Sequence, residues 1–224
     1  WSSRRFTAGS WSELCRGSCR GFRCATGTAK LALPVVDISP LRHRDASASS
    51  RAAVGEDIDA ALRSAGFMYV SGHGVDTSLL TTVRNLAADF FSLMEAEKRI
   101  IQLRGAQTGY RGYQPMEMNV TKGAPDLHEG IDFYKDVLDV TGEASIDANF
   151  RGPNLWPDDV ELLHNRMAQM PTLLAGLPNN VLKSCGDQSS FRSVYQVYIQ
   201  EMLTLGLDIM AGVEIGLGLP PRSL

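Results

Sequence analysis

The segment of residues 109–136 constrains the fold more than any other part of the chain. It reads GYRGYQPMEMNVTKGAPDLHEGIDFYKD and combines glycines, prolines, tyrosines and paired carboxylates, a composition too irregular for a plain helix. Its last part, residues 131–136, alternates apolar and polar side chains, which predicts a β-strand. Irregular segments on a rigid scaffold often carry binding residues, so we expect residues 109–136 to form the wall of a functional site.

The composition is that of a globular protein. The 224 residues are 44% hydrophobic and 21% charged, which excludes global disorder. The net charge of −3 gives no basis for nucleic-acid binding. The longest apolar stretch, residues 203–219, is interrupted by Asp208 and Glu214, so we expect no membrane partner. The four cysteines match no common zinc or redox spacing. We expect the protein to be a monomer.

Residues 1–32 differ from the rest of the chain. They are rich in Arg and Ser and contain a single acidic residue, Glu13. This is the composition of an organellar transit peptide and not of a secretory signal; the alternatives are a disordered leader or translated non-coding sequence. The chain begins with Trp1 rather than Met, so we expect the natural N-terminus upstream. The expected location is the cytoplasm, or a plastid or mitochondrion if residues 1–32 are a transit peptide.

Helices and strands are expected to alternate from residue 33 onward. Residues 33–38 and 67–70 predict strands, and between them a helix from residue 51 ends at Gly66. Asp76 is expected to cap a second helix that ends near residue 94, with residues 95–99 as its solvated end. The final helix, residues 191–217, has an apolar stripe formed by Val194, Tyr198, Met202, Leu205, Ile209 and Val213.

Six segments together are similar to one family. In chain order they read LPVVDIS, AGFMYVSGHGVD, ADFFSLMEAEK, GYRGYQPMEMNVTKGAPDLHEGIDF, GPNLWP and FRSVYQVYIQEM. Their order resembles the N-terminal region of the iron(II)/2-oxoglutarate-dependent dioxygenases of the isopenicillin N synthase-like type. The resemblance implies an α+β fold in which residues 33–157, the N-terminal domain, form an α/β layer. That layer would pack on a double-stranded β-helix, or jelly roll, most of which is missing, and residues 191–224 would lead into it.

The resemblance also implies a chemistry. Such an enzyme uses Fe(II), 2-oxoglutarate and O2 to hydroxylate or desaturate a small organic substrate. Its iron ligands are a His-x-Asp motif and a distal His. The only match here, His43-Arg44-Asp45, lies in an Ala/Ser-rich loop, so we predict no catalytic or metal-binding residue in this chain and no activity of the chain alone. The alternative is a non-catalytic, truncated or mis-spliced relative that acts at most as a binding module.

Arg111 and Tyr113 are the candidate substrate-binding residues. In some relatives an Arg and a Tyr near this Gly-Tyr motif reach the substrate, and the Arg binds a substrate carboxylate by paired hydrogen bonds. The alternative is an Arg111 paired with Glu117 or Glu129, with its aliphatic stem on aromatic rings.

The histidines are expected to be structural. The ring of His73 lies in a Gly-flanked turn and is expected to bond to local backbone. His128 and Asp132 are four residues apart, a spacing that could chelate a metal on a helix, but Gly130 and the strand pattern argue against a helix there.

Residues 158–190 depart from the spacing of the family, in which Trp-Pro and Phe-Arg lie much closer together than Trp156-Pro157 and Phe191-Arg192 do here. The segment contains Gly and Pro breaks and no sustained period of either kind. We therefore predict an atypical insert that forms a mobile, dispensable loop outside the core, either a genuine loop or retained intron-derived sequence.

Overall fold

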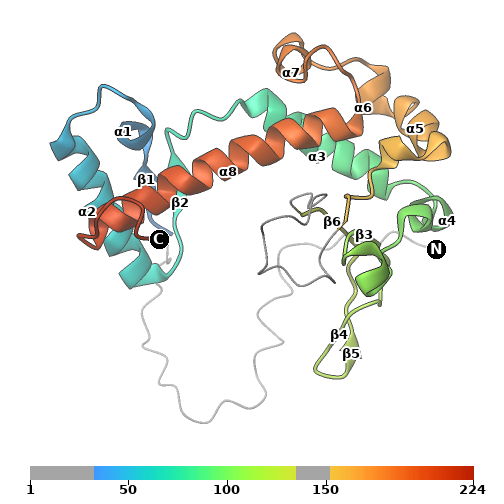
Figure 1. The fold of residues 1–224 in the computed structure, drawn as a ribbon, viewed down its shortest axis with the longest axis horizontal. Coiled ribbons are helices and arrows are strands. Elements are labelled where there is room, and N and C mark those ends of the chain that lie inside the picture. The colour runs from blue at the N-terminus through green and yellow to red at the C-terminus, as the bar shows by residue number, and fades with distance from the viewer. Residues whose placement is uncertain (1–32, 135–151) are drawn as a thin grey trace, which may run out of the picture. The chain divides into compact units, whose positions relative to one another are not determined.

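The structure is a computed structural model that describes residues 33–134 and 152–224 (Figure 1). The predicted leader and the last two residues of the predicted strand 131–136 lie outside the described residues. Residues Pro34–Leu224 form one unit, and its class is α+β, as predicted. None of the helices in the described ranges is long and apolar enough to cross a membrane.

The first part of the fold is a parallel strand pair with a helical crossover. Strands β1 (Val35–Asp37) and β2 (Tyr69–Ser71) pair in parallel, and the connection contains α1 (Ser39–Arg42) and α2 (Ala48–Ala65). The hydroxyl of Ser47 caps α2 by accepting from the Ser50 N–H. Gly66 ends the helix at φ 72°, as predicted, because glycine adopts the left-handed conformation without a Cβ clash.

The second part begins with α3 (Thr77–Phe91), which Asp76 caps as predicted by accepting from the Ser78 N–H. The next residues form a separate helix, α4 (Glu95–Lys98), and a 3-10 turn, η2 (Arg99–Ile101). The prediction of a solvated end is wrong for Glu97 and Lys98, which are 8% and 5% exposed. Both are buried because each pairs with an opposite charge from a distant segment, Arg166 and Glu129 respectively.

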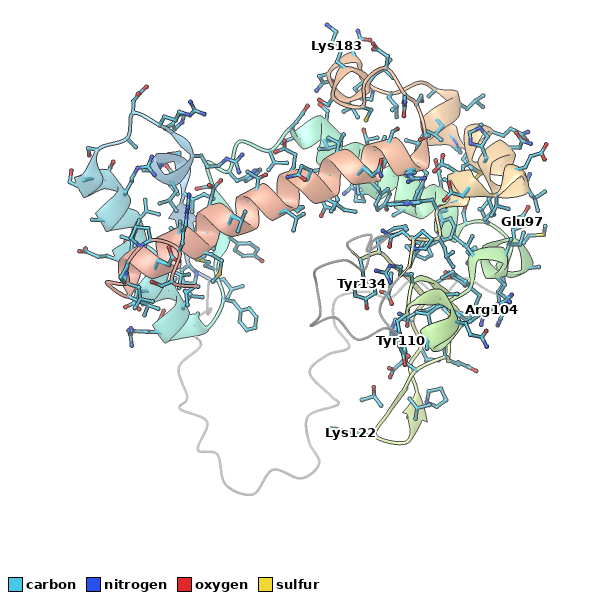
Figure 2. All side chains as sticks on the ribbon, viewed as in Figure 1. Glu97, Arg104, Tyr110, Lys122, Tyr134 and Lys183 are labelled. Atoms are coloured by element: carbon cyan, nitrogen blue, oxygen red, sulfur yellow. The ribbon has the colours of Figure 1, made fainter. Side chains whose placement is uncertain are left out.

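Residues 105–134 form short irregular elements. After the 3-10 turn η3 (Gly105–Thr108), β3 (Gly112–Gln114) pairs antiparallel with β6 (Gly130–Asp132). The strand predicted at residues 131–136 therefore begins one residue earlier, and it ends at Asp132. Between β3 and β6, β4 (Val120–Thr121) and β5 (Ala124–Pro125) form a hairpin, and Lys122 marks its tip in Figure 2. Lys122 and Gly123 both have positive φ, 51° and 82°, as a tight hairpin turn requires.

The prediction of a mobile loop at residues 158–190 is wrong. After the 3-10 turn η5 (Pro157–Asp159), three helices follow: α5 (Glu161–Ala168), α6 (Pro171–Leu174) and α7 (Asn179–Ser184). Leu163, Met167 and Val181 are at most 1% exposed and belong to the main hydrophobic cluster. Leu163 and Met167 stand four residues apart, so they share one helix face, but the helix is too short for a period to be evident in the sequence.

The long helix α8 (Phe191–Gly216) agrees with its prediction and packs on both α2 and α3. The hydroxyl of Ser190 caps it by accepting from the Ser193 N–H. Its first half contributes to what we call the aromatic cluster: Phe90, Tyr113, Phe133, Trp156, Phe191 and Tyr195. Its second half lies against α2 at what we call the glycine contact, formed by Gly55, Gly212 and Gly216.

The glycine contact brings two helix backbones close together. A Cβ added at Gly216 would lie 2.4 Å from the Gly55 carbonyl oxygen. A Cβ added at Gly212 would lie 2.5 Å from a methyl of Ile58. Around it a second, smaller hydrophobic cluster is formed by Val36, Ile38, Leu41, Val54, Ile58 and Ala61, covered by Leu205, Ile209 and Val213 of α8.

Candidate functional site

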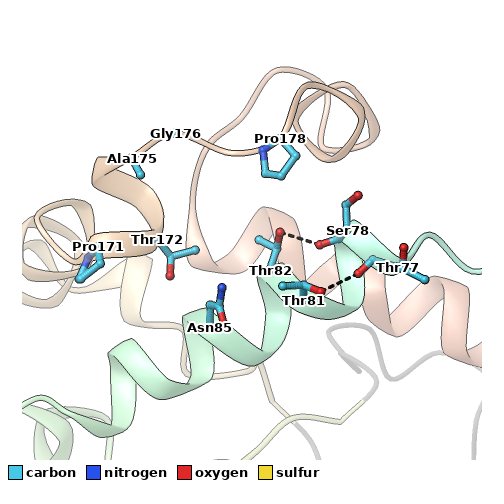
Figure 3. A pocket seen from close by; sticks show the side chains of 10 residues that line it. All are labelled: Thr77, Ser78, Thr81, Thr82, Asn85, Pro171, Thr172, Ala175, Gly176 and Pro178. Carbon is cyan, nitrogen blue, oxygen red and sulfur yellow. Dashed lines mark hydrogen bonds between the residues drawn. The ribbon is translucent and has the colours of Figure 1, made fainter.

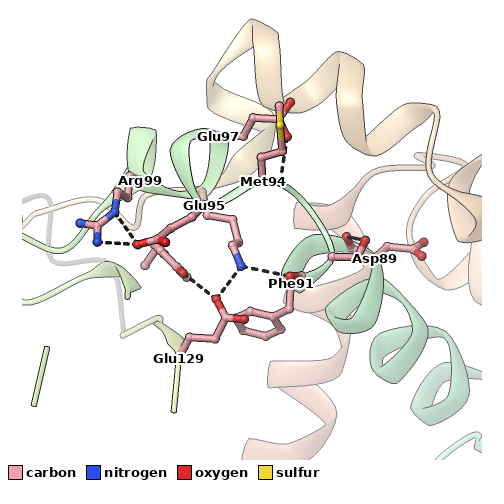
Figure 4. Close-up of polar contacts among 10 residues, drawn as sticks. Asp89, Phe91, Met94, Glu95, Glu97, Arg99 and Glu129 are labelled. Atoms are coloured by element: carbon pink, nitrogen blue, oxygen red, sulfur yellow. Dashed lines mark hydrogen bonds and ion pairs between the residues drawn. The ribbon is translucent and has the colours of Figure 1, made fainter. Parts of the chain in front are cut away.

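The carboxylate of Glu129 is the polar centre of the segment that the sequence singled out. Its Oε2 atom accepts from Lys98 Nζ at 2.6 Å and from the Tyr113 hydroxyl at 2.6 Å (Figure 4). Lys98 Nζ also donates to the Phe91 carbonyl at 3.0 Å and lies 5.3 Å from the centre of the Tyr113 ring. One buried cation thus joins the end of α3, helix α4 and the β3–β6 pair.

Burial and hydrogen bonds set the protonation states of Glu129 and Tyr113. Burial raises the pKa of Glu129, but the hydrogen bonds from Lys98 and Tyr113 and the charge of Lys98 lower it by more, so the net pKa is below its usual value. Burial, and then the bond to Glu129, raise the pKa of Tyr113. At neutral pH Glu129 is therefore an anion and Tyr113 is a neutral hydrogen-bond donor.

Arg111 and Tyr113, the two predicted substrate-binding residues, are brought together in the interior, and each is 1% exposed. The Arg111 guanidinium donates from Nη1 to the Gly109 carbonyl at 2.9 Å, and its central carbon lies 5.4 Å from the centre of the Tyr134 ring. Glu129, one of the two acids considered as an Arg111 partner, is bonded to Lys98 and Tyr113. A role for Arg111 and Tyr113 in substrate binding stays a prediction.

Two stacked pairs of aromatic rings belong to the same hydrophobic cluster as Tyr113. Phe133 stacks on Trp156 at a centroid distance of 4.1 Å, and Phe191 stacks on Tyr195 at 4.3 Å. Asn154 fixes the chain beside them: its Oδ1 accepts from the Tyr134 N–H at 2.8 Å and its Nδ2 donates to the Tyr134 carbonyl at 2.6 Å. The GPNLWP segment therefore positions the end of residues 109–134.

The histidines take up structural or exposed places. His73 Nδ1 accepts from the Val75 N–H at 3.1 Å, so the expected bond to local backbone is confirmed. His43 and Asp45 are exposed, and His128 is exposed just before β6, so His128 and Asp132 do not share a helix. His164 lies on α5 with Nδ1 3.7 Å from an Asp158 carboxylate oxygen.

Within residues 33–134 and 152–224, no three His, Cys, Asp or Glu side chains come together as a possible metal site. The donor set of the described residues therefore does not fit an iron centre. We therefore assign the described residues no chemical step at an iron ion.

Helices α3 and α6 and the residues between α6 and α7 line an open hollow of about 550 Å³ (Figure 3). Its lining residues are uncharged: Thr77, Ser78, Thr81, Thr82, Asn85, Pro171, Thr172, Ala175, Gly176 and Pro178. The hydroxyls of Thr81 and Thr82 donate to the carbonyls four residues earlier, so only their lone pairs face the hollow. The sequence did not predict this hollow because it predicted α3 but not α6, the helix that faces it.

Lys98 and Glu129 are the residues that sequence reasoning missed at this site. Lys98 was assigned to a solvated helix end, and Glu129 was considered only as a partner of Arg111. They stand 31 residues apart, so no local pattern connects them. The available signal was an acid directly before the strand pattern at residue 130, inside a segment otherwise rich in special backbone positions.

The fold is an α+β scaffold that holds a polar group, Lys98, Glu129 and Tyr113, beside a cluster of aromatic rings. The chain belongs to the family described as "non-haem dioxygenase in morphine synthesis N-terminal", whose pattern matches residues 33–159. The predicted family is thereby confirmed, and five of the six segments lie within the matched residues.

Relatives among curated proteins carry related names. The chain is 38% identical over 157 residues to a homoarginine-6-hydroxylase of Arabidopsis thaliana, a match that covers 67% of this chain and 46% of that protein. It is 34% identical over 194 residues to a homoarginine-6-hydroxylase of Oryza sativa subsp. japonica, covering 84% of this chain and 50% of that protein. The chain thus spans about half the length of these relatives.

Solved structures agree in fold. Full-length T7H of Neurospora crassa in complex with alpha-KG superposes with a TM-score of 0.59 and 18% identity, over 88% of this chain and 50% of that chain. At this identity the likeness concerns the fold alone. It extends across most of the described chain.

Proposed function

We propose that this chain is the N-terminal part of a non-haem iron(II)- and 2-oxoglutarate-dependent oxidoreductase that hydroxylates or desaturates a small organic substrate with O2. The observation that carries the proposal is the family match over residues 33–159, together with relatives named as hydroxylases and dioxygenases. In this proposal Fe(II) and 2-oxoglutarate are bound by the jelly-roll part of the parent protein. The present residues build the layer that packs on it, and the chain alone is inactive.

The packing of the interior favours the proposal of an intact enzyme over that of a truncated or mis-spliced relative. The buried Lys98 and Tyr113 both bond to the half-buried Glu129, and a buried charge persists in a fold only when it is paired. In residues 158–190, Leu163 is fully buried against the main cluster. Translated non-coding sequence has no physical reason to supply apolar side chains at the spacing of a helix face.

The names of the relatives suggest the first substrate to test. Four of them, from Arabidopsis, rice and soybean, are homoarginine-6-hydroxylases. We propose an amino acid or another small molecule with a carboxylate as the substrate class. Arg111 is the residue of this chain that would bind that carboxylate, since a guanidinium matches its two oxygens.

The test uses the full-length protein that contains this chain, supplied with Fe(II), ascorbate and 2-oxoglutarate. We expect O2-dependent succinate formation that homoarginine or another small carboxylate stimulates. Arg111→Lys is expected to raise the substrate KM more than the 2-oxoglutarate KM, with Arg104→Lys, in the preceding segment, as the control. No succinate from a folded, iron-loaded protein with any candidate would contradict the proposal.

A sequence experiment separates this function from the non-catalytic alternative. The transcript that encodes this chain is extended and translated beyond residue 224. A His-x-Asp motif, a distal His and an Arg-x-Ser are expected if the parent is an enzyme. A transcript that encodes none of them would favour a truncated binding module.

A further inference from the structure

We propose that Glu129 is a positioning residue, held by Lys98, which keeps Arg111 and Tyr113 in register for substrate binding. The inference rests on the proposed function and assigns a role to a carboxylate that touches neither substrate nor metal. It concerns the short strand pair β3–β6 and the helix end that supports it.

The strand pair is too short to fix its own register. Each strand has three residues, with Tyr113 opposite Ile131, and few backbone hydrogen bonds hold the two strands. A slip by one residue would turn Tyr113 and its neighbours to the other face of the pair. Side chains resist such a slip at two points: Gln114 Nε2 donates to the Asp132 carboxylate, and the Tyr113 hydroxyl donates to Glu129.

Two bonds of Tyr113 reach outside the strand pair: the Leu103 N–H donates to the Tyr113 carbonyl at 2.9 Å, and the Tyr113 hydroxyl donates to Glu129. Through Lys98, Glu129 connects β3 to α4 and to the Phe91 carbonyl at the end of α3. The adjacent Phe90 packs edge-on to the Tyr113 ring at 6.1 Å. Gly112 lies so close to η2 that an added Cβ would be 2.3 Å from the Ile101 carbonyl oxygen. The backbone of β3 therefore packs against η2 at Gly112, and its Tyr113 side chain is held by Glu129.

The position of Arg111 depends on the position of β3. It directly precedes Gly112 and stands two residues before Tyr113, so any shift of β3 moves its backbone by the same amount. Misplacement of a binding group by about 1 Å can cost a hundredfold in rate even when no contact with the substrate is removed. A positioning residue should therefore affect substrate binding without affecting the binding of the co-substrate elsewhere.

The experiment compares Glu129→Gln with Glu95→Gln in the full-length protein. Glu95 lies on α4, is exposed and pairs with Arg99, so its substitution removes a nearby ion pair but none of the hydrogen bonds of Tyr113. For Glu129→Gln we expect the substrate KM to rise about tenfold while the 2-oxoglutarate KM stays within about twofold. Lys98→Met should act in the same direction, and Glu95→Gln should change neither KM.

Tyr113→Phe is the second variant, in case Glu129→Gln does not fold, because it keeps the buried ring and removes one hydrogen bond. It should raise the substrate KM about threefold. An unchanged substrate KM, or parallel changes in both KM values that track the melting temperature, would overturn the positioning role while leaving the proposed function intact. A folded wild-type protein without 2-oxoglutarate turnover would overturn the proposed function and this inference with it.

Discussion

The two halves of α8 are stabilised in opposite ways. At the aromatic cluster, large rings from α8, α3, Phe133 and Trp156 pack together, and Phe191 and Phe90 are fully buried there. At the glycine contact, the space between α8 and α2 is removed, because Gly216 and Gly55 carry no side chains to separate the backbones. The first region depends on side chains that are present, and the second on side chains that are absent.

This difference explains where the polar network lies. The rings of the aromatic cluster pack at centroid distances of 4.1 to 6.4 Å, and the Lys98–Glu129–Tyr113 group lies at the edge of this cluster, where Tyr113 belongs to both. The glycine contact leaves no room for such a group between its helices. The part of the chain that we propose to serve substrate binding is therefore built on the region of large side chains. Truncation should damage the aromatic cluster most, and enlargement should damage the glycine contact most.

The largest effect is expected for Phe191→Ala. Because Phe191 is 0% exposed and contacts three other rings, its truncation should lower the free energy of unfolding by about 3–5 kcal/mol. Phe191→Leu keeps most of the volume and should cost less than about 1.5 kcal/mol. Urea denaturation measures both. Equal effects of the two substitutions would show that the cluster does not depend on filled volume.

Leu163→Ala tests whether residues 158–190 belong to the same region. Leu163 is fully buried whereas its neighbour Leu162 is 51% exposed. We expect Leu163→Ala to cost about 2–4 kcal/mol of unfolding free energy and Leu162→Ala to change it by less than about 0.5 kcal/mol. If both variants unfold like the wild type, α5 does not contribute to the stability of the main cluster.

Gly216→Ala tests the other half of α8. The added methyl would meet the Gly55 carbonyl oxygen, and backbone cannot move aside, so we expect a loss of about 1–3 kcal/mol. Gly206→Ala is the matched control on the same helix, because no atom outside its own helix lies within 4 Å of the added Cβ. It should stabilise the protein by about 0.5–1 kcal/mol. A stabilising Gly216→Ala would disprove the close contact.

The smallest effect is expected from pH at the polar network. The folded pKa of Glu129 is lowered below its model-compound value of 4.5, so its charge contributes stability above pH 4.5 that is lost as pH falls through the folded value. The melting temperatures of the wild type and Glu129→Gln should therefore differ most near neutral pH and converge in acid. A difference that grows as the pH falls would show that the sign is wrong.

The sequence predicted what depends on neighbouring residues. The Asp76 cap, the Gly66 stop and the stripe of α8 are local patterns, and the structure has all three. It did not predict what depends on distant partners. Lys98 and Glu129 are joined across 31 residues, and Glu97 and Arg166 across 69. The sequence did not single out Gly212 and Gly216, and only the packing of α2 shows why a larger residue is excluded there.

The continuity of α8 across both regions restricts how its length can vary. One residue inserted near Thr204 would rotate the second half relative to the first by about 100° and advance it by about 1.5 Å. Gly216 would then turn away from Gly55, and Gly212 from Ile58, although every side chain of the helix would still be present. The distance in residues between Phe191 and Gly216 is thus as constrained as the residues themselves, so relatives that share this pairing of regions should vary α8 by substitution and not by insertion or deletion.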